Sequence, residues 1–240
     1  MATKKKFIKE WSSPSFGEVL NVEVVGDGGT PILFFDGFGT TSKENKLQKI
    51  KDIFAYQIEN GFNQIYFPAY PSGVNLCETE HDARKRLVMH SKYEEYIIHE
   101  LVPFIKRETG INSLIIAGTH LGATEASILA FKHPEKFLKL IHVCGPFDIK
   151  PYFNEDSGRD VYYNNPAEFI PLIRDENLIK SISCIDIRIV SHQDSLWKDQ
   201  AYQISDSMNY LQIPHHLDVW GKDTVYNAET MADMLLKHVP

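Results

Sequence analysis

A short glycine-containing turn is the feature of this 240-residue sequence that most limits its fold. The turn reads Gly-Thr-His-Leu-Gly over residues 118–122, and it joins the apolar run 114–117 to the small and apolar residues 123–130. A short apolar run bounded by turn residues is typical of a strand buried on both faces. Glycines on both sides of His120 permit the sharp turn that connects such a strand to a helix. The turn therefore predicts an α/β fold.

Strand-like and helix-like segments alternate along the rest of the chain. Strands are expected at 18–25, 31–35, 64–68, 113–117, 138–144, 186–191 and 216–220, and helices at 43–60, 81–109, 122–131, 197–211 and 226–238. Pro103 falls inside the second of these helices and is expected to kink or split it. The alternation predicts a mostly parallel sheet with helices on both faces, in a single domain over residues 1–240. The Pro- and Asn-containing stretch 147–178 is expected to form a lid or insertion at the C-terminal edge of the sheet.

Composition and charge argue against several classes of protein. The formal net charge is −7, whereas nucleic-acid-binding domains usually carry a basic face. No apolar stretch approaches the roughly 18 residues of a membrane span, and no signal peptide is recognisable. The widely spaced Cys77, Cys144 and Cys184 are interpreted as reduced thiols in a cytoplasmic protein. We therefore expect no nucleic-acid or membrane partner, no metal and no cofactor. A homodimer remains one of the alternatives.

The turn and several other segments resemble the α/β-hydrolase superfamily, and within it the bacterial esterase family related to esterase D and enterochelin esterase. The similar segments lie at residues 11–14, 31–35, 90–96, 131–137, 147–148, 161–166 and 213–221. The resemblance implies an α/β-hydrolase fold and acyl transfer to water through a serine, a histidine base and a carboxylate. That serine stands at the tip of a Gly-x-Ser-x-Gly nucleophile elbow. Here the tip residue is His120, so the frame of a serine hydrolase is present without its nucleophile.

The other two positions of the implied triad differ in how far they are altered. Family members carry the histidine just after the last Trp-Gly pair or a few residues on. Here residues 222–226 read Lys-Asp-Thr-Val-Tyr, and no histidine lies between His216 and His238. Asp194 follows a buried strand, where this fold places its carboxylate, although a helix cap is an equal interpretation. His192 lies beside Asp194 and could face the same cleft, but the spacing matches no strong metal-binding motif.

Backbone amides near His120 are expected to line a cleft. In the α/β-hydrolase fold one oxyanion donor is the N–H of the residue after the nucleophile, and another comes from the loop after the third strand. An inward-facing Asp36 carboxylate would repel a developing oxyanion, and we favour an outward, turn-forming orientation. The residues expected to bind a ligand are Asp36, Gly37, Phe38, Leu121, His192 and Trp197.

Three functional hypotheses remain open from the sequence. The first is an esterase-like pseudoenzyme that keeps its cleft for a small acyl or ester-like ligand or for a partner. The second is a hydrolase or acyl transferase with altered chemistry, which uses His120 with Asp194 or a lysine. The third is a scaffold or interaction protein whose pocket is filled by side chains such as Phe38, Tyr162 or Trp197. Because two triad positions are altered together, we favour the first hypothesis, then the third.

Overall fold

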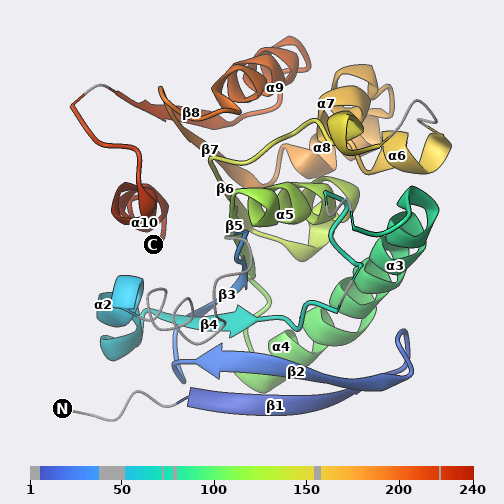
Figure 1. Ribbon diagram of the computed structural model, residues 1–240. Helices are drawn as coiled ribbons and strands as arrows, with labels where there is room; N and C mark the ends of the chain where they lie inside the picture. The colour runs from blue at the N-terminus through green and yellow to red at the C-terminus, as the bar shows by residue number, and fades with distance from the viewer. Residues whose placement is uncertain (1–5, 38–51, 72, 78–79, 154–157, 222) are drawn as a thin grey trace.

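The computed structural model describes residues 6–37, 52–71, 73–77, 80–153, 158–221 and 223–240. In this part of the chain eight strands form one sheet, in the order β1-β2-β4-β3-β5-β6-β7-β8 (Figure 1). Two pairs are antiparallel: β1 (Lys6–Ser13) with β2 (Glu18–Val25), and β2 with β4 (Asn63–Phe67). All other pairs are parallel, and they join β3 (Thr30–Phe35), β4, β5 (Ile115–Thr119), β6 (Lys139–Val143), β7 (Asp186–His192) and β8 (His216–Trp220). The expected mostly parallel sheet is confirmed.

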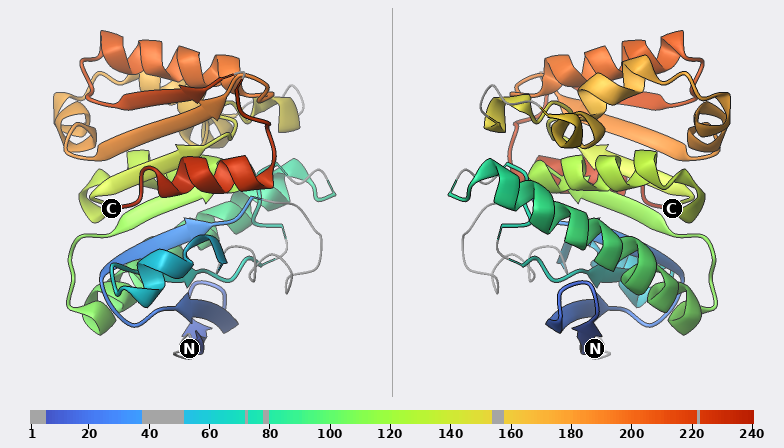
Figure 2. Two further views of the ribbon diagram at one scale, coloured as in Figure 1. Left: turned by 90° about the vertical axis from the view of Figure 1, so that its left-hand side faces the viewer. Right: turned by 90° about the vertical axis from the view of Figure 1, so that its right-hand side faces the viewer.

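Helices cover both faces of the sheet (Figure 2). One face carries α3 (Ala83–Glu95), η1 (Tyr96–Leu101), α4 (Val102–Thr109), α5 (Leu121–Lys132), α7 (Pro166–Phe169), η4 (Ile170–Leu172), α8 (Glu176–Ile182) and α9 (Lys198–Tyr210). The opposite face carries α2 (Ala55–Glu59) and α10 (Ala228–Leu236). Three shorter elements are η2 (Pro134–Lys136), η3 (Lys150–Tyr152) and α6 (Arg159–Tyr163). None of the helices in the described ranges is long and apolar enough to span a membrane.

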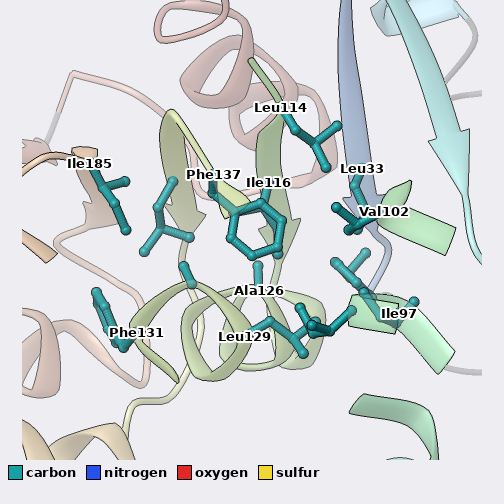
Figure 3. Packing of buried hydrophobic residues seen from close by; sticks show 14 of the residues in the cluster. Leu33, Ile97, Val102, Leu114, Ile116, Ala126, Leu129, Phe131, Phe137 and Ile185 are labelled. Carbon is teal, nitrogen blue, oxygen red and sulfur yellow. The ribbon is translucent and has the colours of Figure 1, made fainter. Parts of the chain in front are cut away.

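Helix α5 lies against the middle of the sheet and is buried from Gly122 to Phe131. Its apolar side chains pack against side chains of the parallel strands, with Ala126 and Leu129 close to Ile116 (Figure 3). The alanines let the helix axis come close to the strands, and each larger side chain removes apolar surface from water. This packing fixes where α5 begins, and therefore where the turn at residue 120 lies.

Pro103 does not split the helix expected over 81–109. The π-helical segment η1 stands directly before it and joins α3 to α4 without a break in the chain of helical turns. Proline lacks an N–H and clashes with the carbonyl four residues earlier, and wider π-type turns relieve such a conflict.

Within η1, the Glu100 carboxylate accepts hydrogen bonds from Trp11 Nε1 at 2.7 Å and from Ser15 Oγ at 2.6 Å. The π-helical segment thus anchors the β1–β2 hairpin.

Other expectations met different outcomes. The seven expected strands are present, two with the expected bounds and five with ends shifted by one or two residues. β1 was missed because its sequence, Lys-Phe-Ile-Lys-Glu-Trp-Ser-Ser, has neither an apolar run nor a regular alternation of apolar and polar residues. Of the helix expected over 43–60, residues 43–51 lie outside the described part of the chain, and α2 lies in the remainder. The stretch 147–178 contains short helices whose apolar side chains join the core beneath α5 and α9. Its role as a lid stays a prediction.

Candidate functional site

His120 lies at the tip of the turn between β5 and α5. Its φ of 48° and ψ of −125° place a non-glycine residue in a region that favours glycine, so the backbone is strained there. A Cβ added to Gly122 would lie 2.1 Å from the Phe35 carbonyl oxygen, and one added to Gly37 would lie 2.0 Å from the Thr119 oxygen. The backbones of β3, β5 and α5 therefore meet as closely as a nucleophile elbow requires.

The half-buried imidazole of His120 has a defined protonation pattern. Its Nδ1 lies 3.2 Å from the carbonyl oxygen of Cys144. Because a carbonyl oxygen only accepts hydrogen bonds, Nδ1 carries the proton and Nε2 carries the lone pair. Burial lowers the pKa of His120, although the hydrogen bond to Cys144 opposes this effect, so the ring is neutral at pH 7. The His120 and Trp197 rings form a T-shaped contact, with their centroids 5.6 Å apart and their planes at 69°.

Cys144 follows β6 and also has a positive φ, of 49°. Its carbonyl accepts from His120 and its thiol donates to Met234 Sδ at 3.9 Å, while the side chains of Tyr226 and Ser195 lie beside the sulfur. Burial raises the pKa of the Cys144 thiol to about 11. Burial, followed by the nearby Cys144, raises the pKa of the Tyr226 hydroxyl to about 12. Both groups are therefore protonated at neutral pH, and neither is a base beside His120.

Asp194 and His192 lie at the end of β7 but do not form a catalytic pair with His120. The Asp194 side chain is 75% exposed, and its backbone N–H donates to His192 Nδ1 at 3.0 Å. The buried His192 ring donates from Nε2 towards the Thr224 carbonyl and hydroxyl oxygens, at 3.2 and 3.1 Å, and stacks on Tyr226. Both nitrogens of His192 thus join the turn after β7 to the loop after β8. Asp194 makes no helix-capping bond among the described residues, whereas the Ser195 hydroxyl accepts from the Trp197 N–H at 3.3 Å, directly before α9 begins.

The structure brings several of the expected site residues together. Gly37 lies against the backbone amides of Leu121 and Gly122, and a Cβ on Gly37 would be 2.5 Å from each nitrogen. Trp197 joins them through its contact with His120. Asp36 is half-buried at the end of β3, and Phe38 lies outside the described residues. In the part of the chain that the structure describes, no three His, Cys, Asp or Glu side chains gather as metal ligands.

Sequence reasoning missed the layer behind His120, which consists of Cys144, Ser195, Thr224 and Tyr226. These residues follow three different parallel strands, and the ends of parallel strands meet at one edge of the sheet. Their position after strands was a usable signal. Cys144 is buried, and its backbone carbonyl contacts the His120 ring.

A cavity of about 290 Å³ lies beside the end of β8 and the loop that follows it. It is lined by Asp218, Trp220, Gly221, Thr224 and Lys237, among others. The Asp218 carboxylate already accepts from Lys237 Nζ at 2.7 Å and from Trp220 Nε1 at 3.1 Å. This cavity does not include His120, so we place the candidate site at the elbow.

A comparison with protein families matches residues 31–230 to the family described as "Putative esterase". The chain belongs to this esterase family. Among solved structures it is similar to a ferulic acid esterase, with 16% identity, a TM-score of 0.76, and coverage of 99% of this chain and 97% of that chain. It is also similar to the S-formylglutathione hydrolase FrmB from Staphylococcus aureus, with 13% identity, a TM-score of 0.67 and the same coverage. No curated protein sequence matches. The structural likeness confirms the expected α/β-hydrolase fold.

The chemistry of the site differs from the triad implied for the esterase family. The tip residue is His120, whose imidazole is neutral. In the described loop after β8, where the family carries its histidine, Thr224 and Tyr226 lie near the strand ends instead. The Leu121 amide is the first N–H of α5, and the first N–H groups of a helix have no partner within the helix.

Proposed function

We propose that this member of the esterase family binds a small acyl compound at the elbow and does not hydrolyse esters by serine chemistry. The observation that carries the proposal is the imidazole of His120 at the strained tip, with Nδ1 bonded to the Cys144 carbonyl. An elbow nucleophile of the serine type needs a hydroxyl that an adjacent base can deprotonate. His120 has no hydroxyl, and its Nδ1 proton is directed to a backbone oxygen.

The base position supports the same proposal. No histidine follows β8 before His238, and the His238 ring is bonded to Asp218 at 2.9 Å. Tyr226, with its pKa raised to about 12, remains protonated at neutral pH. Under this proposal Asp194 stands at the position of the family's catalytic acid but no longer acts as one. Its carboxylate is exposed, and the neighbouring His192 is bonded to Thr224.

Hydrolysis of p-nitrophenyl acetate tests this proposal. We expect the wild-type protein and a His120→Ala variant to release nitrophenol at the same rate, close to that of buffer. An active esterase in the same buffer serves as the positive control. Turnover by the wild type that disappears in His120→Ala would overturn the proposal, because it would assign catalysis to the elbow.

A second candidate is nucleophilic catalysis by His120 itself. The neutral ring and the fixed Nδ1 proton favour it, because an imidazole attacks through an unprotonated nitrogen. In this reaction Nε2 would bond to the acyl carbon and the leaving group would depart with its electron pair. Mass spectrometry after exposure to an activated acyl or phosphoryl donor should then find an adduct on His120. Absence of label with several donors contradicts this candidate.

The interaction hypothesis is a further alternative. The contact of Trp197 with His120 resembles a filled pocket, and Tyr162 packs against the core, while Phe38 lies outside the described residues. A homodimer and a cytoplasmic location remain parts of this proposal. Sedimentation of the purified protein over a range of concentrations tests the dimer.

A further inference from the structure

The cavity beside the end of β8 is a second place where this chain can bind a small molecule. Its volume of about 290 Å³ is close to the lower limit of small-molecule sites, which is roughly 300 Å³. Among the described strands only β7 pairs with β8, so the outer edge of β8 is open beside the cavity. The walls come from β8, from the loop after it and from Lys237, which follows α10.

The indole ring of Trp220 lines this cavity and already has a cation beside it. The Nζ atom of Lys237 lies 5.4 Å from the centroid of the Trp220 ring, a distance at which the π-electrons attract a cation. The same Nζ lies 2.7 Å from Asp218 Oδ2. The Lys237 side chain is 53% exposed, and exposed ion pairs contribute only about 1 kcal/mol or less. Another ammonium group can therefore replace that of Lys237.

The charges of the described lining residues leave an excess of negative charge. Asp218 and Asp223 supply two carboxylates, and Lys237 is the one cation among these residues, while Lys222 lies outside the described part of the chain. Burial lowers the pKa of His238, although its hydrogen bond to Asp218 opposes this effect, so the ring is neutral at pH 7. Within the described ranges, no hydrogen bond or ion pair involves Asp218 Oδ1 or the Asp223 carboxylate. These oxygens can accept from a ligand.

We propose that this cavity binds a small organic amine in its protonated form. The ammonium group lies against the Trp220 ring in place of Lys237 Nζ and donates to the carboxylates of Asp218 and Asp223. An anionic ligand would be repelled by these carboxylates, and a neutral ligand would gain neither the ion pairs nor the cation–π contact. The cavity does not include His120, so this inference is independent of the function proposed for the elbow.

Benzylamine, benzyl alcohol and benzoate test this inference, because they share one aromatic ring and differ in charge at pH 7. The ¹⁵N–¹H indole resonance of Trp220 reports binding in an NMR titration of the full chain, and a Trp220→Phe variant assigns it among the three tryptophans. We expect benzylamine to shift this resonance and to bind about fivefold more tightly than the other two compounds. Equal binding of benzyl alcohol or benzoate overturns the inference, as does a Trp220 resonance that benzylamine does not shift.

Two variants test the charges that surround the ligand. Lys237→Met removes the competing ammonium group, so benzylamine should bind about threefold more tightly. Asp223→Asn removes one carboxylate, so benzylamine should bind about threefold more weakly. Asp199→Asn is the matched control, because Asp199 is 87% exposed on α9 and does not line the cavity, and its affinity should equal that of the wild type. Weaker binding by Lys237→Met, or unchanged binding by Asp223→Asn, overturns the inference.

Discussion

Glu94 joins the long helix before the elbow to the end of the elbow helix, and Glu94→Gln tests how strongly this contact holds them together. One carboxylate oxygen accepts from His133 Nε2 at 2.7 Å, and the other is paired with Lys132. The Glu94 side chain is 16% exposed, so solvent screens the contact only in part. Burial raises the pKa of Glu94, but His133 and Lys132 outweigh burial and lower the pKa to about 2 from the ordinary 4.5.

The size and sign of the effect follow from this pKa. The difference between 4.5 and about 2 corresponds to about 3 kcal/mol of stability at neutral pH. Because the folded-state pKa is lowered, this stability is complete above pH 4.5 and is lost as the pH falls towards 2. At pH 3 about 1.4 kcal/mol of it remains. We expect Glu94→Gln to lower the free energy of unfolding by about 3 kcal/mol at pH 7, and by about 1.4 kcal/mol at pH 3.

Urea unfolding followed by circular dichroism at pH 7, 5, 4 and 3 measures this difference. Glu95→Gln is the matched control, because Glu95 is adjacent on the same helix, is 62% exposed and contacts only His99 among the ion pairs found in the described chain. The control should differ from the wild type by less than about 0.5 kcal/mol at each pH. A Glu94→Gln difference that stays constant from pH 7 to pH 3, or one below about 1 kcal/mol at pH 7, refutes the reasoning.

Three further predictions concern the elbow and the hairpin. Gly122→Ala should lower the free energy of unfolding by about 3 kcal/mol in urea titrations, because its Cβ would meet the backbone of β3, whereas the Cβ of Gly158→Ala meets nothing within 4 Å and should be neutral. His120→Ser should not gain turnover of p-nitrophenyl acetate, because the loop after β8 still lacks a histidine base; measurable turnover would contradict this. Glu100→Ala should cost about 2 kcal/mol in thermal unfolding, since Trp11 Nε1 loses a charged acceptor, and an unchanged midpoint would disprove this role.

The parallel strands could be predicted from the sequence because each is a short apolar run with turn residues at its ends. The turn at 118–122 could be predicted for a similar reason, since glycines at fixed spacing permit only a few local conformations. The segment around Pro103 could not be predicted in the same way. The sequence shows a proline in a helix, but not that a π-helical segment precedes it or that Glu100 in this segment bonds to Trp11 of the hairpin.

The sequence by itself determined the α/β fold, the position of the elbow and the presence of a histidine in place of serine. Only the tertiary structure decided the state of that histidine. The Cys144 carbonyl, the Trp197 ring and the buried surroundings come from segments far away in the chain, and together they set the proton position and lower the pKa of His120. Such contacts depend on how the strand ends converge in space, which local sequence patterns do not specify.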